Sequence, residues 1–102
     1  MLKKNFKFYV KTHDENLIVA ICDSDLIGKT FEEKDLQLKV SENFYKGILL
    51  NEEEIIEIMK QAKNLNLVGT NIIELGLKLN LIEKEHILYI NKIPHAQVFE
   101  LW

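Results

Sequence analysis

The segment from Leu17 to Cys22 restricts the fold more than any other, because it is continuously apolar and rich in β-branched residues. Such a run is typical of a strand that is buried on both faces of a sheet. The preceding residues 6–11 alternate Phe6, Phe8 and Val10 with polar or half-polar residues, as a half-buried strand does. A polar turn at residues 13–16 separates the two segments, so we predict a hairpin that leads into a central strand.

Alternation of apolar and polar residues also predicts a third strand over residues 36–40, after a connector, residues 26–34, that contains Gly28. Helical signals follow. Asn51 and Glu54 have the spacing of a capping box, and an apolar stripe at helical spacing continues to a helix end near Asn64.

A second helix, largely apolar, is predicted from residue 70 or 71 to residue 79 or 80. Gly76 lies inside it, which indicates close packing against another element.

The chain ends with two apolar segments, residues 86–90 and 93–101, joined by Asn91-Lys92. Asn tolerates the positive φ of a tight primed turn, so we predict a terminal hairpin. Pro94 has no amide proton, which favours an edge strand, a bulge or an outward-facing position, and of these we predict an edge strand. The predicted order is β-β-β-α-α-β-β, an α+β fold with two helices on a small antiparallel or mixed sheet, in one domain over residues 1–102.

Composition limits the class of protein. The chain has 102 residues and 47% hydrophobic residues, which suits a globular domain, and no apolar run long enough to span a membrane. Its single cysteine fits a reducing compartment, and we read no secretory signal, so we expect a cytoplasmic location and no membrane partner. The net charge is −3 and all thirteen basic residues are lysines, so no guanidinium is available to bind phosphates or bases.

Two motifs with known chemistry are incomplete. Gly28-Lys29-Thr30 resembles the end of a phosphate-binding loop, but Asp23 stands where that loop needs glycine. Glu83 and His86 have the spacing of a metal-binding pair, yet the chain has no second copy. We therefore predict no metal site and no cofactor.

Cys22 allows two interpretations. A lone cysteine at the end of a buried strand is usually an inert core residue. Alternatively, Cys22 is a nucleophile that His95 activates while Asp23 orients the imidazole, which requires the last strand to pass beside the end of the second.

Five residues are candidates for binding. His95 and Gln97 share one face of the last strand, opposite Ala96 and Val98. In residues 41–47, Phe44 and Tyr45 point in opposite directions if the backbone is extended, so that one ring faces inward while the other, beside Lys46, offers a stacking surface. Gly47 would allow a turn with positive φ, and Asn66 would cap the turn before the second helix. The binding candidates are His95, Gln97, Tyr45, Lys46 and Asn66.

Several short motifs occur in a recognisable order along almost the whole chain. They are Cys22-Asp23, residues 26–29, Phe44-Tyr45 with Gly47, Asn66 with Val68-Gly69, and residues 94–98. This ordered set resembles the archaeal domain-of-unknown-function 424 family. The resemblance implies a small cytoplasmic archaeal protein and carries no known activity.

Three functions remain open. The leading hypothesis is a non-enzymatic binding module that attaches to RNA or to a protein of the translation apparatus. It rests on the lysine-rich first strand, the Phe44-Lys46 segment and the polar face of His95 and Gln97. The alternatives are a small enzyme that uses Cys22, Asp23 and His95, and a protein-interaction or oligomerisation domain that works through a sheet edge or Trp102.

Overall fold

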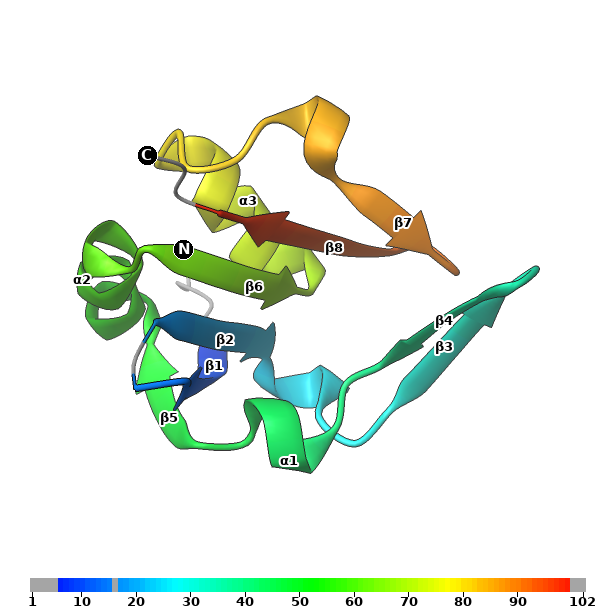
Figure 1. The fold of residues 1–102 in the computed structure, drawn as a ribbon, viewed down its shortest axis with the longest axis horizontal. Helices are drawn as coiled ribbons and strands as arrows, with labels where there is room; N and C mark the ends of the chain where they lie inside the picture. The colour runs from blue at the N-terminus through cyan, green and yellow to red at the C-terminus, as the bar shows by residue number, and fades with distance from the viewer. Residues whose placement is uncertain (1–5, 16, 100–102) are drawn as a thin grey trace, which may run out of the picture.

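A computed structural model describes residues 6–15 and 17–99 of the chain, which form an α+β fold with a large mixed sheet and a small second sheet (Figure 1). The large sheet has six strands in the order β5-β1-β2-β6-β8-β7, and β3 and β4 form the second sheet. The strands are β1 (Lys7–His13), β2 (Ile18–Asp23), β3 (Thr30–Glu33), β4 (Leu36–Lys39), β5 (Ile48–Asn51), β6 (Asn64–Val68), β7 (Leu88–Ile90) and β8 (Ile93–Val98). The helices are α1 (Glu42–Tyr45), α2 (Glu52–Gln61) and α3 (Thr70–Lys78). The predicted α+β class is confirmed, but the predicted order lacked β3, α1, β5 and β6.

The first hairpin and the central strand are confirmed. β1 and β2 pair antiparallel, and β2 lies between β1 and β6, with the residues from Val19 to Asp23 buried. Residues 17–22 are continuously apolar because both faces of β2 are covered.

The strand β6 was missed by the sequence analysis, which assigned its residues to a loop. It pairs in parallel with β2 and antiparallel with β8. Asn66 is therefore a residue of an inner strand, and the prediction that it caps a turn is wrong.

The connector after β2 is also more ordered than predicted. It contains β3, which pairs with the predicted third strand, β4, to form a hairpin outside the main sheet. This hairpin extends past β7 (Figure 1), where the Asn91 amide donates a hydrogen bond of 2.6 Å to the Glu33 carboxylate.

The capping box of α2 is confirmed in both directions. The Glu54 amide donates to Asn51 Oδ1 at 2.9 Å, and the Asn51 amide donates to Glu54 Oε1 at 3.0 Å. The helix ends at Gln61, a few residues before the predicted end, because β6 begins at Asn64.

The helix α3 is enclosed as predicted. A Cβ atom on Gly76 would lie 3.1 Å from Ile82 Cδ1, so close packing explains why glycine stands in the helix.

The terminal hairpin is confirmed, and both turn residues have positive φ, 49° at Asn91 and 68° at Lys92. The predicted edge position of Pro94 is wrong, because β8 lies between β6 and β7. An inner strand tolerates this proline because its neighbour β6 ends just before Gly69. The Gly69 amide donates to the Pro94 carbonyl at 3.0 Å, while the Gly69 carbonyl accepts from the Ile73 amide of α3 and needs no donor from residue 94.

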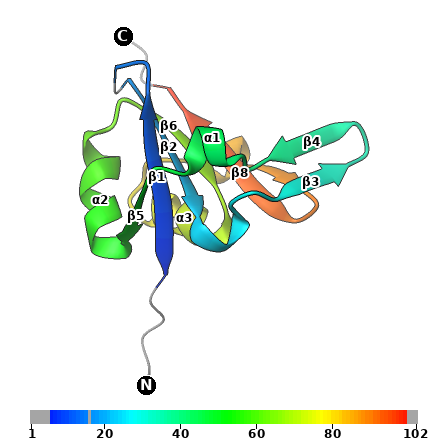
Figure 2. The ribbon, with the colours of Figure 1, turned by 90° about the horizontal axis from the view of Figure 1, so that it is seen from below.

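Two hydrophobic layers lie on opposite faces of the sheet. The larger joins α2 and α3 to Phe8, Ile21, Leu67 and their neighbours. The smaller, around Cys22, Tyr45 and Val68, joins α1 and β4 to the other face. Figure 2 shows α2 and α1 on opposite sides of β1.

Candidate functional site

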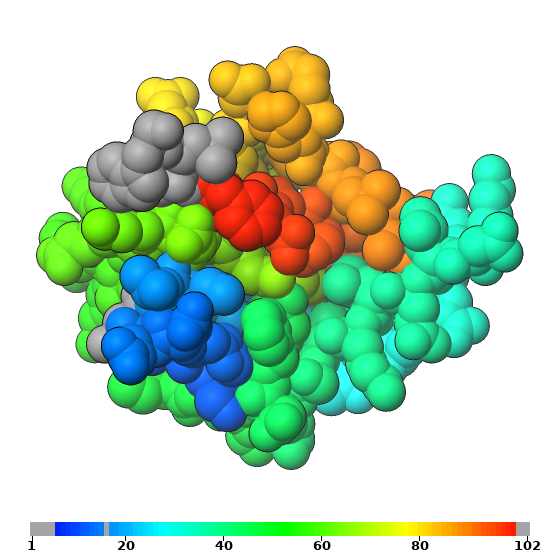
Figure 3. Space-filling view, viewed as in Figure 1, coloured from blue at the N-terminus to red at the C-terminus, as the bar shows by residue number. Residues whose placement is uncertain are grey.

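The strand register places most of the predicted binding residues on one face of the sheet, the face that α1 covers in part. Residues Tyr9, Cys22, Val68 and His95 follow one another across β1, β2, β6 and β8, and so project from the same face. One step along the strands, Asn66 lies opposite Gln97 on this face. We call Asn66, His95 and Gln97 the polar face. In the space-filling view, the end of β8, the start of β6, the β1–β2 hairpin and α1 meet on one side of the molecule (Figure 3).

Asn66 is held from α1 by the Tyr45 hydroxyl, which donates a hydrogen bond of 2.6 Å to Asn66 Oδ1. Tyr45 is only 3% exposed, and burial raises the pKa of its hydroxyl above the ordinary value, so the hydroxyl remains a neutral donor. Since Oδ1 accepts this bond, the Asn66 amide nitrogen is the group left to donate hydrogen bonds.

His95 also has a fixed polarity. Its Nδ1 atom lies 3.0 Å from the Leu67 carbonyl oxygen, which can only accept, so Nδ1 carries a proton. In the neutral ring, Nε2 is then an acceptor. The Gln97 side chain is exposed and can donate or accept. The prediction that His95 and Gln97 share a face is confirmed by the register.

The segment around α1 differs from the extended backbone that the sequence analysis assumed. Ser41 Oγ accepts a hydrogen bond of 3.1 Å from the Phe44 amide and caps the short helix. Tyr45 is the ring that faces inward, as one of the two was predicted to do, whereas Phe44 is partly buried. Lys46 is exposed and its Nζ lies 3.7 Å from the Glu42 carboxylate.

Gly47 does not have the predicted positive φ, which among the described glycines occurs at Gly28 and Gly69. A Cβ atom on Gly47 would instead collide with the Val10 carbonyl oxygen, so this glycine allows β5 to start close against β1.

Two side chains of β1, Lys11 and His13, border the polar face. Lys11 belongs to the lysine-rich first strand of the sequence analysis, whereas His13 was assigned there to a polar turn. The His13 ring stacks on Phe44 with 4.4 Å between centroids and 13° between planes, and His13 Nε2 donates to the Phe44 carbonyl at 2.8 Å. Lys11 Nζ donates to the Asn43 carbonyl at 2.7 Å. These contacts join residues more than thirty positions apart. Tyr9, Lys11 and His13 lie at every second position of β1 and therefore share one face. No local pattern shows that α1 lies above Lys11 and His13.

The residues of the predicted enzyme site are not brought together. Cys22 is fully buried, and burial raises the pKa of its thiol to about 12, so the thiol remains protonated at neutral pH. His95 lies two strands away with Val68 between them, a separation of about 10 Å from the usual strand spacing.

Asp23 projects from the opposite face and serves α3. Its Oδ2 and Oδ1 atoms each accept a hydrogen bond of 2.9 Å, from the amides of Asn71 and Ile72 respectively. These two amides belong to the first turn of α3, so the carboxylate caps the helix from the end of β2. Cys22, Asp23 and His95 therefore do not form the arrangement that the enzyme hypothesis requires, in which Asp23 orients the His95 imidazole.

Further predictions concern metal ions, membrane spans and the ends of the chain. Within residues 6–15 and 17–99, no group of three or more His, Cys, Asp or Glu side chains is arranged to hold a metal ion. Over the same residues, no helix is long and apolar enough to cross a membrane. Lys3 and Lys4, which precede the lysine-rich first strand, and Trp102, the proposed interaction residue, lie outside the described residues.

Known proteins resemble this chain in sequence and fold. A crystal structure of an uncharacterized conserved protein from Methanopyrus kandleri superposes with a TM-score of 0.70, covering 94% of this chain and 95% of that chain at 22% sequence identity. At this identity the likeness concerns the fold alone. No curated protein matches the sequence. Residues 10–101 match the family described as "Protein of unknown function (DUF424)". The chain therefore belongs to the DUF424 family.

Proposed function

We propose that the chain is a non-enzymatic binding module whose polar face takes single-stranded RNA. The observation that carries this proposal is the convergence of Asn66, His95 and Gln97 on adjacent strands of one sheet face. Asn66 is anchored by Tyr45, and His95 by the Leu67 carbonyl, so two of the three polar groups are held in position before any ligand arrives.

The hydrogen-bonding groups of this face suit unstacked bases. His95, which is partly exposed, offers an acceptor, and the exposed Gln97 offers a donor or an acceptor, at the separations of about 5–7 Å that neighbouring positions on a sheet provide. Asn66, only 9% exposed, links this face to α1 through Tyr45. Single-stranded RNA exposes base edges that carry donors and acceptors, and its bases stack on protein rings. Phe99, 62% exposed, and the Phe44–His13 stack supply rings near the polar face.

Positive charge on the same face comes from β1. Lys7, Tyr9 and Lys11 lie at every second position of β1, so the two lysines project from the face that carries the polar residues. Phosphate contacts by these two lysines would lower log affinity by about 1.4 per tenfold rise in salt, at roughly 0.7 per single-strand phosphate. The proposal extends to the RNA of the translation apparatus, which co-sedimentation with ribosomal subunits would test.

Fluorescence anisotropy with labelled ten-nucleotide single strands of uracil or adenine tests the proposal. We expect Gln97→Ala and His95→Ala each to weaken binding about 2- to 10-fold, because one hydrogen bond contributes about 0.5–1.5 kcal/mol. Gln61→Ala is the matched control, since Gln61 is exposed on α2 behind the sheet. Undetectable binding, binding that ignores salt, or an equal loss in Gln61→Ala would each refute RNA binding by this face.

A further inference from the structure

A cavity of about 410 Å³ lies beside the end of β8, on the side away from β6. One wall is formed by the segment between α3 and β7, with Asn80, Ile82, Glu83 and His86. The other wall is formed by Gln97 to Phe99. This volume lies within the range of roughly 300–1,000 Å³ of ligand pockets.

The cavity runs along a stretch of β8 that has no neighbouring strand. The main chain of Pro94 faces β6, because its carbonyl accepts from the Gly69 amide. Main-chain groups alternate sides along a strand, so the amide and carbonyl of Gln97 face away from β6. On that side β7 pairs with His95 through Leu88 and begins there. The residue opposite Gln97 would be His86, which instead belongs to a 3-10 turn, Lys84–His86. The edge of β8 at Gln97 is therefore open toward the cavity.

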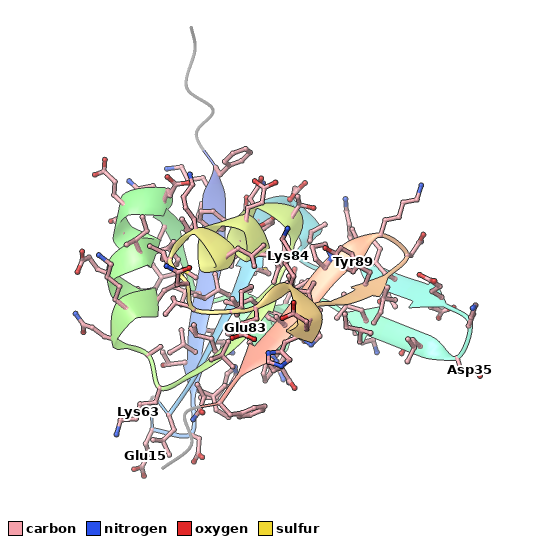
Figure 4. The ribbon with its side chains drawn as sticks, turned by 90° about the horizontal axis from the view of Figure 1, so that it is seen from above. Glu15, Asp35, Lys63, Glu83, Lys84 and Tyr89 are labelled. Atoms are coloured by element: carbon pink, nitrogen blue, oxygen red, sulfur yellow. The ribbon has the colours of Figure 1, made fainter. Side chains whose placement is uncertain are left out.

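The charge of the cavity favours a cation. Its lining includes the Glu83 carboxylate and the His86 imidazole but, among the described residues, no lysine. Figure 4 shows the Glu83 side chain on the β8 side of the loop, whereas Lys84 extends from the other side. An RNA phosphate would be repelled by this carboxylate, whereas a lysine or arginine side chain would be attracted.

We propose that this cavity binds a short extended peptide of a partner protein, which adds a strand beside Gln97 and places a basic side chain against Glu83. A peptide satisfies both features at once, because its main chain pairs with an open strand edge while its side chains alternate into the flanking pocket. The apolar side chains of Ile82 and Val98 in the lining would contact the aliphatic part of that basic residue. This site is separate from the proposed RNA surface in charge and in most of its residues.

The test uses a synthetic heptapeptide of alternating lysine and valine and the full chain labelled with ¹⁵N. We expect the peptide to shift the amide signals of Gln97 and Phe99, and Glu83→Gln to weaken its binding about two- to five-fold. Glu85→Gln is the control, since Glu85 neighbours Glu83 in sequence, is exposed and does not line the cavity. The same peptide with N-methyl groups on alternate residues should not bind, because it cannot complete the strand pairing.

Several results would overturn the proposal. They are no binding of the lysine–valine peptide, equal binding of a glutamate–valine peptide, an equal effect of Glu85→Gln and Glu83→Gln, or unshifted Gln97 signals. If a uracil decamer shifts the same amides and competes with the peptide, the cavity belongs to the RNA surface. If the peptide binds only after removal of residues 100–102, the end of the chain itself occupies the cavity.

Discussion

Among the described residues, two polar side chains are buried, Asp23 at 4% exposure and Asn66 at 9%, and both connect elements that are distant in sequence. Asn66 joins β6 to α1 through Tyr45, and Asp23 joins β2 to α3 through two backbone amides. A buried polar group without a partner costs about 1–3 kcal/mol, so each of these residues favours one arrangement of its elements over others.

The carboxyl of Asp23 should make stability depend on pH. Burial raises its pKa to about 6, although the amides of Asn71 and Ile72 act in the opposite direction. The native state then holds a proton between pH 4 and 6 that the unfolded state releases, so this group lowers the free energy of unfolding as pH rises through that window. The full contribution is at most about 3 kcal/mol, from about 1.4 kcal/mol per pKa unit.

Urea unfolding of the Asp23→Asn variant at several pH values measures this effect. We expect the variant to lose the decline in stability between pH 4 and 6. Asp25→Asn should retain most of it, because Asp25 is exposed and acts on Asp23 only through space. Parallel pH curves for wild type and Asp23→Asn would show that the carboxyl titrates normally.

At the scale of elements, the parallel pair β2–β6 organises the molecule, because it places the ends of both strands beside the start of α3. The chain leaves β6 at Gly69, whose φ of 124° and lack of a side chain let the backbone pass against the Asp23 carboxylate. The polar face depends on the same pair, since β6 carries Asn66 and separates β2 from β8.

The turn between β7 and β8 contains a residue whose replacement should raise the free energy of unfolding. Lys92 has a φ of 68°, which costs an ordinary residue about 1 kcal/mol or more and costs glycine little. We expect Lys92→Gly to raise the free energy of unfolding by about 0.5–1 kcal/mol, measured by urea titration. Lys39→Gly, in the exposed strand position of β4, should lower it instead. Loss of stability in Lys92→Gly would mean that the lysine side chain contributes more than its backbone strain costs.

For the whole molecule, the ends of the large sheet differ. Its two edge strands are β7 and β5, and each pairs with a single described strand. The β3–β4 hairpin contacts β7, whereas no described strand pairs with the outer edge of β5. Ile48 and Leu49 of β5 are 65% and 47% exposed. Exposed apolar edge strands favour pairing with another chain.

We therefore expect self-association through β5, with two copies pairing edge to edge. Light scattering across a range of concentrations should show a dimer that Ile48→Lys disrupts. Leu36→Lys, at a similarly exposed apolar residue in β4, should leave it intact. A monomer at every concentration, or equal effects of the two substitutions, would contradict this expectation.

Local sequence patterns were sufficient for the elements that local forces hold together. The β1–β2 hairpin, the capping box of α2, the enclosed α3 and the Asn91-Lys92 turn all depend on residues a few positions apart. The shared face of His95 and Gln97 follows from the period of a strand alone. The alternation of Asn64, Leu65, Asn66 and Leu67 was also a strand signal, but its asparagines favoured a loop assignment.

The tertiary structure decided which strands are neighbours and, through that, which side chains meet. Pro94 lies in an inner strand because β6 turns into α3 beside it, and Asp23 caps a helix that begins 47 positions later. Neither contact has a local signature, since both arise only when β2, β6 and β8 align. The sequence alone places His95 and Gln97 of the Pro94-to-Val98 segment on one face of a strand. Their neighbours Asn66 and Tyr45, and the open edge at Gln97, come from the pairing of distant strands.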